Sequence, residues 1–396
     1  MTAMSSTSIN GTYRKQNLLT FVVALFPSLF LLANQYRMFG NSPTFYVVSL
    51  LVFGAIGVLV GLKLDKKSRW VYYGTMLLFA ITESLNVALV GNTTFEGVAY
   101  NILIFGLVAI MFVYPHSYFQ GIVVYYVLMM FFIPIFLRGE LAIYILTSSQ
   151  NYVSVCLILA ASIYYIGVDN GGKGLRLIDL LPALLCFMLS VWAMGRGGIL
   201  TSLFLLTSMS LIYLVKKAIR NKFLFILIPF LFAGIVLFLM RRGINPFDML
   251  MSLGKLESKG MESTERMNLW VPYIQKLTES PGYFFFGVPL TEIPVIMLFE
   301  GNTHNSFIQL HAYNGIVMVL VFVVLLIKSL IYYIKKRNFL LLILTLTVVF
   351  RGMTDKFIFG QYGMPIMMYL VLYPYLASDK EEESDQEAEW EETETL

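Results

Sequence analysis

Apolar runs recur along the chain from Leu18 to Ala377, and only short polar links separate most of them. Most runs approach the roughly 20 residues that a helix needs to cross the hydrocarbon core of a bilayer. The short alternating segments of a transmembrane β-barrel are absent. The pattern therefore predicts an all-α, polytopic transmembrane helix bundle of about 12 helices. The predicted spans are 17–35, 44–62, 70–90, 97–115, 118–137, 149–167, 177–194, 198–215, 223–240, 305–328, 339–352 and 362–377.

The amino-acid composition also indicates that the protein lies in a membrane. Hydrophobic residues make up 58% of the chain and charged residues only 13%, whereas a soluble domain carries about 25% charged residues. This difference excludes an ordinary soluble globular domain. The lipid bilayer is therefore the first partner that the sequence predicts.

Lysine and arginine in the short links predict the orientation of the bundle. Cytoplasmic links usually carry the excess of these residues, and the basic clusters all fall on one side in this helix count. Both termini are then cytoplasmic, with residues 1–16 before a membrane domain of residues 17–378 and an acidic tail of residues 379–396, whose composition is typical of disorder. The clusters are Arg14-Lys15, Lys63-Lys66-Lys67-Arg69, Lys173-Arg176, Lys216-Lys217-Arg220-Lys222 and Lys335-Lys336-Arg337.

Several classes of protein are disfavoured. The net charge of +4 is explained by topology, and no motif of nucleic-acid recognition accompanies it, so we expect no nucleic-acid partner. Cys156 and Cys186 lie inside apolar runs, which argues against a disulfide framework or a zinc site. We expect no metal and no cofactor. The first apolar run lacks a small-residue cleavage site, so we interpret it as an uncleaved helix.

One link is much longer than the others. The predicted outer loop of residues 241–304 mixes charges, glycine, proline and aromatics, and its length makes it a functional candidate. Ser263 or Thr264 can cap a helix that starts near Glu265. Pro272 is expected to interrupt this helix and leave two short pieces or one kinked piece. Trp270 and Tyr273 would suit the headgroup region of the outer interface.

Polar groups at or in the membrane are candidates for function, because they are costly without partners. Arg196 lies in the turn Gly195-Arg196-Gly197-Gly198, Arg266 lies in the long loop, and His304 opens the tenth span. Each also has a structural interpretation: an arginine that snorkels from a tight turn, a solvated helix with a cation–π pair, and a satisfied structural histidine. His311 lies two turns beyond His304, and Gln309 and Asn314 extend this polar stripe into the bundle or a cavity.

These groups suit a phosphate-bearing ligand. A diphosphate leaving group gains negative charge in the transition state, and arginine stabilises that charge with two parallel hydrogen bonds and no metal. Histidine can accept the proton of an attacking sugar hydroxyl near neutral pH. Arg351 and Lys356, in a predicted outer link, can add positive charge to the same site.

The loop and its neighbouring helices contain a series of short motifs in a fixed order. They are Gly195-Arg196-Gly197-Gly198, Glu262-Ser263-Thr264-Glu265-Arg266, Trp270, Ser280-Pro281-Gly282, Phe286-Gly287-Val288, His304-Asn305-Ser306-Phe307 and Gly315. In the order and spacing of these motifs, the chain between about residues 193 and 323 resembles the O-antigen ligase and polymerase family. It departs from the pattern at Gly195, where many relatives have serine, and at Pro272.

The resemblance implies a metal-independent glycosyltransferase of the bacterial cytoplasmic (inner) membrane. Its donor would be an undecaprenyl-diphosphate-linked glycan, used on the outer face with a glycan acceptor, and a flippase and a chain-length regulator would be its partners. Arg196 and Arg266 match positions that contact diphosphate, and His304 matches the position that assists acceptor attack. We assign further substrate contacts to Trp270, Asn305, His311 and Arg351.

The acceptor is left open by the sequence. We favour a polymerase of lipid-linked repeat units for O-antigen, capsule or exopolysaccharide, because it requires no special acceptor surface. The alternative within the family is an O-antigen ligase that transfers the glycan to another acceptor. A flippase for the same lipid-linked glycans is an alternative of another class, and Glu83 with Asn86 in the third span favours it. A scaffold that acts through its acidic tail is the last alternative.

Overall fold

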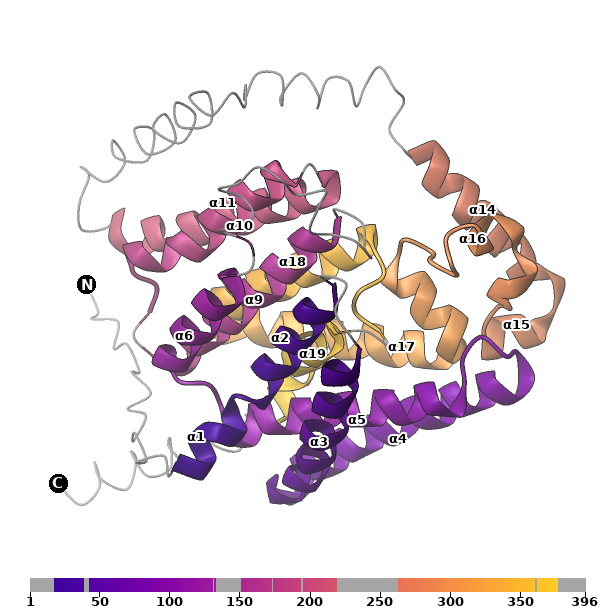
Figure 1. Cartoon of the computed structure of the whole chain (residues 1–396), viewed down its shortest axis with the longest axis horizontal. Helices are drawn as coiled ribbons and strands as arrows, with labels where there is room; N and C mark the ends of the chain where they lie inside the picture. Colours follow the sequence, from indigo (N-terminus) through magenta and orange to yellow (C-terminus); the bar gives the residue numbers. More distant parts are fainter. Residues whose placement is uncertain are drawn as a thin grey trace.

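A computed structural model describes residues 18–38, 43–130, 132, 151–172, 174–193, 195–218, 263–359 and 362–376. All the regular elements in these ranges are helices (Figure 1). The side chains of Arg196 and Arg266 lie outside the described part, although the backbone of each belongs to a described helix. The first half of the predicted outer loop, the predicted span 223–240 and the acidic tail also lie outside it.

The described helices follow the predicted apolar runs closely. The first run is a pair, α1 and α2, that bends by 41°. In chain order the helices are α1 Leu18–Ala24, α2 Phe26–Met38, α3 Thr44–Val60 with η1 Gly61–Lys63, α4 Lys66–Leu89, α5 Phe95–Val113, α6 Tyr118–Met129, α9 Asn151–Asn170, η2 Leu177–Leu180 with α10 Leu181–Trp192, α11 Arg196–Ala218, α14 Ser263–Glu279, α15 Pro281–Phe286, η3 Leu290–Glu292, α16 Pro294–Met297, α17 Ser306–Lys335, α18 Phe339–Thr354 and α19 Met364–Leu376.

The helices support a membrane protein by their length and composition. Within the described ranges, 5 helices are long and apolar enough to cross a membrane, or up to 6 if the bent pair counts as one span. Four shorter apolar helices are Tyr118–Met129, Leu177–Trp192, Phe339–Thr354 and Met364–Leu376. The all-helical class is thereby confirmed for the described residues, and the count of about 12 spans stays a prediction.

Contacts between helix ends divide the bundle into two ends. The basic end contains the clusters at residues 63–69 and 335–337 and the residue Arg176. There Asn338 Nδ2 donates to Asp169 Oδ1 at 2.9 Å, and Ser68 Oγ donates to the carbonyl of Tyr375 at 3.0 Å. These bonds join the links that the charge pattern assigns to one side.

The other end, called the site end below, collects the opposite ends of the same helices. The Tyr152 ring near the start of α9 lies 6.3 Å from the Tyr362 ring before α19. Asn305, just before α17, donates from Nδ2 to the carbonyl of Met353 near the end of α18 at 3.3 Å. The links that were predicted to share the outer side are therefore neighbours in space.

Small residues allow the closest helix contacts. A Cβ built on Gly57 of α3 would lie 2.1 Å from the carbonyl oxygen of Gly106 on α5, so the two backbones touch. Close backbone approach of this kind is typical of helix packing in membranes. α9 lies at the centre of the bundle: 89% of the residues in its most apolar stretch are buried in the protein.

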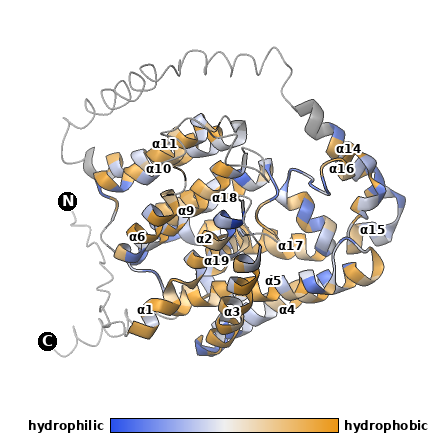
Figure 2. Cartoon of the chain, in the orientation of Figure 1, coloured by the Kyte–Doolittle hydropathy of each residue, from blue (hydrophilic) through white to orange (hydrophobic). Residues whose placement is uncertain are grey.

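The helices α14, α15 and α16 form a lobe at one edge of the bundle (Figure 1), which is more hydrophilic than most of the bundle (Figure 2). The lobe has its own apolar core, which includes Leu269, Tyr273 and Ile296 and packs against Ala312 of α17. Tyr273 is buried there, so the expectation that it sits among lipid headgroups is wrong. Its side chain is used to hold the lobe together.

Pro272 lies within a single helix, so the two separate pieces allowed by the sequence-based expectation are wrong. α14 continues through Pro272 from Ser263 to Glu279. A proline leaves the carbonyl four residues earlier without its helical partner. That residue is Asn268, which is exposed, so water can solvate the released carbonyl.

Candidate active site

The start of α17 is fixed to the end of α18 by short polar residues. Asn305 caps α17, because its Oδ1 accepts from the backbone N–H groups of Phe307 at 2.8 Å and Ile308 at 3.2 Å. Ser306 Oγ donates to the carbonyl of Asp355 at 2.7 Å and accepts from Phe357 N–H at 3.1 Å. Asn305 was predicted to contact substrate, and its observed bonds give it the role of a helix cap.

His304 precedes this cap in a left-handed backbone conformation. Its φ is 50°, and its N–H donates to Asn302 Oδ1 at 2.8 Å. This conformation is uncommon for a residue other than glycine and tends to occur where function requires it. The imidazole Nδ1 lies 4.0 Å from Asp355 Oδ1, and the side chain is 26% exposed. The Phe299 ring packs edge-on at 5.4 Å.

Asp355 also holds a buried arginine. Arg351, only 1% exposed, donates from Nη2 to Asp355 Oδ2 at 3.1 Å and from Nη1 to Thr354 Oγ1 at 2.8 Å. Arg351 was expected at the outer link, where the predicted span 339–352 ends, and α18 includes it and extends to Thr354. Asp355 was not predicted as a site residue, because a lone acid beside a lysine in a link carries no distinguishing pattern.

Lys356 extends the charged group. Its backbone N–H donates to Asp355 Oδ1 at 2.8 Å. Burial lowers the pKa of Lys356, and the negative charges of Asp355 and Glu300 oppose that shift. The positive charge that Lys356 was predicted to add to the site is therefore partly offset by the carboxylates of Asp355 and Glu300.

The Gly195–Gly198 turn packs directly on Arg351. A short link joins α10 to α11, as predicted, but α11 already begins at Arg196, and Ile199 N–H donates to the carbonyl of Gly195 at 2.9 Å. A Cβ on Gly197 would lie 2.9 Å from Thr354 Oγ1 and 3.7 Å from Arg351 Nη1. The backbone of Arg196 is therefore adjacent to the Arg351–Asp355 pair.

Trp270 joins the lobe to the His304 segment. Its indole Nε1 donates to the carbonyl of Thr303 at 3.0 Å. Arg266 lies one helical turn before Trp270 on α14. Trp270 was predicted to contact substrate, and the observed bond shows that it also positions the residue next to His304.

His311 is occupied within the protein on both ring nitrogens. Its Nε2 lies 3.0 Å from the carbonyl of Phe284, which can only accept, so Nε2 carries the proton. Its Nδ1 then accepts from the Tyr273 hydroxyl at 2.6 Å. Burial raises the pKa of Tyr273, which keeps that hydroxyl protonated. The substrate contact predicted for His311 is corrected to a structural one, because no ring nitrogen remains for a ligand.

Helix α17 is broken at Gly315, where φ is 65° and ψ is −176°. The break releases carbonyl groups, and the one on Ala312 accepts from Asn86 Nδ2 at 2.8 Å and Asn92 Nδ2 at 2.7 Å. The same two amides donate to the carbonyls of Phe286 and Val288 at 2.6 Å. Asn86 and Asn92 therefore join α4, the broken helix and the lobe. The sequence marked Gly315 and Asn86 without predicting this junction.

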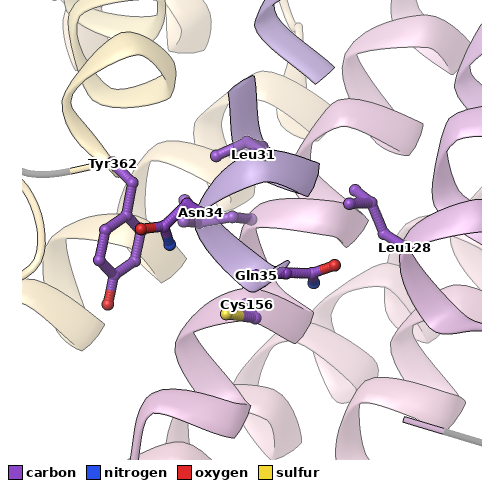
Figure 3. A pocket seen from close by; sticks show the side chains of 7 residues that line it. Leu31, Asn34, Gln35, Leu128, Cys156 and Tyr362 are labelled. Atoms are coloured by element: carbon purple, nitrogen blue, oxygen red, sulfur yellow. The ribbon is translucent and has the colours of Figure 1, made fainter. Parts of the chain in front are cut away.

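A small cavity lies close to the site end, between α2, α6, α9 and Tyr362 (Figure 3). Gln35 Oε1 and the Tyr362 hydroxyl are buried and have no hydrogen-bond partner among the described residues. Such atoms cost roughly 1–3 kcal/mol when unsatisfied, so they are candidates for contact with a hydroxyl group. The adjacent amides of Asn34 and Gln35 at the end of the first apolar run were the signal that sequence reasoning missed.

Glu83 is separate from this group. Both of its carboxylate oxygens accept from Asn101 Nδ2 on α5, at 2.9 and 2.7 Å. The sequence predicted pairing with another helix and left the partner open. The partner is a neutral amide.

The described residues thus bring His304, Asp355, Arg351 and the Arg196 turn together at one end of the bundle. Within the described ranges no group of three or more histidine, cysteine, aspartate or glutamate side chains could hold a metal ion. Comparison of the chain with protein-family models, with curated proteins and with solved structures finds no match in any of the three.

Proposed function

We propose that the protein is a membrane glycosyltransferase that polymerises undecaprenyl-diphosphate-linked oligosaccharide repeat units of a surface polysaccharide on the outer face of the cytoplasmic membrane. The observation that carries the proposal is the meeting of His304, the Arg351–Asp355 pair and the Arg196 turn at the site end. The lobe that contains Arg266 and Trp270 contacts the same segment through Thr303. The motif resemblance described above supports the same reaction.

The proposed reaction needs two kinds of group. A hydroxyl oxygen of the acceptor sugar attacks the anomeric carbon of the donor, and the bond from that carbon to the diphosphate oxygen breaks. His304 takes the hydroxyl proton, and undecaprenyl diphosphate leaves as an anion. Arg196 and Arg266 stabilise its growing charge. Arg351 is buried against Asp355, so its role is to position the Arg196 turn and Asp355.

Reconstitution tests the proposal directly. The purified protein in liposomes, given a synthetic undecaprenyl-diphosphate-linked repeat unit, should produce a ladder of longer lipid-linked glycans, analysed by gel electrophoresis and mass spectrometry. A single transfer to an added lipid A core, without a ladder, would favour the ligase. Movement of the labelled repeat unit across the bilayer without any transfer would favour the flippase and contradict the proposed chemistry.

Asp355→Asn should impair the enzyme in a specific way. The neutral amide no longer stabilises a protonated imidazole 4.0 Å away, so the acid limb of the pH–rate profile should move to lower pH. The buried Arg351 also loses its counter-ion, which costs roughly 3–5 kcal/mol when one partner of a buried pair is removed. Thermal unfolding in detergent measures this loss. An unchanged pH profile in the folded variant would contradict the role of Asp355 beside His304.

Deletion of residues 379–396 separates the enzyme from the scaffold alternative. The tail contains none of the proposed site residues, so the truncated protein should keep most of its polymerising activity in liposomes. The full-length protein at the same liposome density is the control. Complete loss of polymer formation with normal insertion would favour the scaffold.

A further inference from the structure

An uncharged aromatic segment of the lobe is exposed at the edge of the bundle. From Ser280 to Thr291 the chain has no charged residue, and this stretch contains α15. Phe284 is 43% exposed and Phe285 is 52% exposed. Two adjacent exposed phenylalanines in an uncharged stretch indicate a contact surface.

The position of α15 along α17 indicates what covers these rings. Exposed apolar side chains form a row on α17 that begins at Val317, directly after the break, and continues to Ile334. At 1.5 Å per residue this row is about 26 Å long, close to the roughly 30 Å thickness of the hydrocarbon core. Lys328 lies next to Ile327 but does not place its charge in the row. Its ammonium group lies 6.0 Å from the centre of the Tyr375 ring, in the direction of the basic end. The members of the row are Val317, Leu320, Val324, Ile327, Ile331 and Ile334.

Phe285 lies near the Val317 end of this row. A Cβ built on Gly315 would lie 1.8 Å from the carbonyl oxygen of Phe285, so the two backbones are in contact. Gly315 is two residues before Val317. The exposed Phe285 ring therefore starts from the level at which the exposed apolar row begins.

Helix α4 has a second row that ends at the same place. Leu77, Ile81, Leu85 and Leu89 are exposed and four residues apart, so they follow one face of α4. Asn86, between the last two, donates to the carbonyl of Phe286 at 2.6 Å. The end of α15 is thus bonded to α4 where that row ends, and the rows of α4 and α17 both lead to α15.

We infer that α15 is a wedge that inserts Phe284 and Phe285 among the acyl chains of the bilayer lipids on the site side. Lipid acyl chains are expected to cover the two apolar rows, and the same lipid would also cover the rings at their ends. The uncharged sequence of α15 suits a position at the edge of the hydrocarbon core. Trp270 and Tyr273 were expected from the sequence to contact the membrane interface. In this inference, Phe284 and Phe285 of the same loop make the aromatic contact with lipid.

The wedge sets the depth of the candidate site. The carbonyl of Phe284 is bonded to His311, His311 is bonded to Tyr273 on α14, and α14 is bonded through Trp270 to Thr303, next to His304. A lobe anchored in the acyl chains keeps His304 near the level of the headgroups. This consequence rests on the proposed function, because a lipid-linked diphosphate would lie at that level, whereas the lipid contact itself does not depend on it.

Spin labelling tests the lipid contact without any assay of activity. A nitroxide is attached to Phe285→Cys in phosphatidylethanolamine and phosphatidylglycerol liposomes, and its accessibility to oxygen, which concentrates in the bilayer, is compared with that to a water-soluble nickel chelate. Leu320→Cys on the α17 row and the exposed Thr278→Cys on α14 are the lipid and water references. Both native cysteines are buried, so the unsubstituted protein gives the background.

The label at 285 should resemble the label at 320, with an oxygen-to-nickel ratio several-fold above that at 278. A ratio equal to that at 278 would overturn the inference. So would spin–spin broadening that disappears on dilution with unlabelled protein, because it would identify a second copy as the occupant. If Phe285→Cys does not fold, Phe285→Trp keeps an aromatic ring, and its fluorescence should be quenched by brominated lipid and not by iodide.

An activity measurement then tests the consequence for the site. Phe285→Ser should raise KM for the lipid-linked donor in liposomes several-fold and leave kcat nearly unchanged. In detergent, with a short-chain donor, the variant and the unsubstituted protein should be equal. Equal KM values in liposomes would reject the role in setting site depth, while absence of any transfer by the unsubstituted protein would reject the proposed function alone.

Discussion

His304→Ala should abolish long-chain polysaccharide in the producing cell while the protein remains folded and inserted. Loss of a proton acceptor lowers the rate by about two to four orders of magnitude, which is enough to leave only single repeat units on the lipid. The imidazole makes an edge contact with Phe299 and approaches Asp355 at 4.0 Å. Gel analysis of extracted polysaccharide, together with immunoblotting of the membrane fraction, measures both properties.

Arg266→Ala should have the same effect for a different reason. Loss of one donor to the developing charge costs about two to three orders of magnitude in rate. Arg266→Lys should also be poor, because a point charge does not replace the planar guanidinium. Lys276→Ala, on the same helix, is the matched control. Lys276 pairs with Glu279 at 2.6 Å and Glu292 at 2.8 Å on the surface, where such pairs contribute little to stability.

These variants can reject the site assignment. Wild-type chain length in either alanine variant would contradict it, and full activity of Arg266→Lys would contradict a diphosphate contact at that position. Labelling that places Arg266 and His304 on the cytoplasmic side would reject the proposed function as a whole. Activity in the Lys276→Ala control is required before any loss at Arg266 is interpreted.

Gly315→Ala should destabilise the junction between the lobe and the bundle. The backbone there lies in a region that only glycine occupies readily, which costs roughly 1–3 kcal/mol for another residue. The added Cβ would also lie 1.8 Å from the carbonyl oxygen of Phe285, and overpacking of this kind typically costs a further 1–3 kcal/mol. We expect faster proteolytic cleavage within the lobe, which begins at residue 263, and a lower midpoint of thermal unfolding in detergent.

Gly74→Ala adds the same methyl group in helix α4 and is the matched control. A Cβ at Gly74 meets no heavy atom within 4 Å, and alanine favours a helix by about 0.5–1 kcal/mol over glycine. The control should therefore be neutral or slightly stabilised. Equal stability of the two variants would show that the lobe tolerates movement away from α17, and the described junction would then be wrong.

The fold was largely predictable because membrane solvation acts on each span separately. Length and apolar content predict where each helix lies, and the described helices begin and end close to the predicted limits. The Gly195–Gly198 turn followed from an apolar stretch too long for one span. The possible division into two pieces at Pro272 was wrong, because the penalty for an internal proline depends on whether the released carbonyl at Asn268 can reach water.

The site was predictable only in part. His304, Arg351 and the Arg196 turn were identified because charged or titratable groups are rare in such a sequence. Asp355 and the cavity that contains Gln35 were missed, because their significance depends on partners far apart in the chain. His311 was assigned to substrate from its spacing, and the spacing could not reveal that Tyr273 and Phe284 take both of its nitrogens.

The sequence by itself determined that this chain is helical, suited to a membrane and basic at one set of links, since these properties depend on the composition of short segments. Only the tertiary structure decided which polar groups meet at the site end, that α17 breaks at Gly315, and which aromatic rings remain exposed. The reason is physical: a hydrogen bond requires two groups within about 3 Å, and residues such as Asn86 and Ala312 reach that distance only after the helices pack.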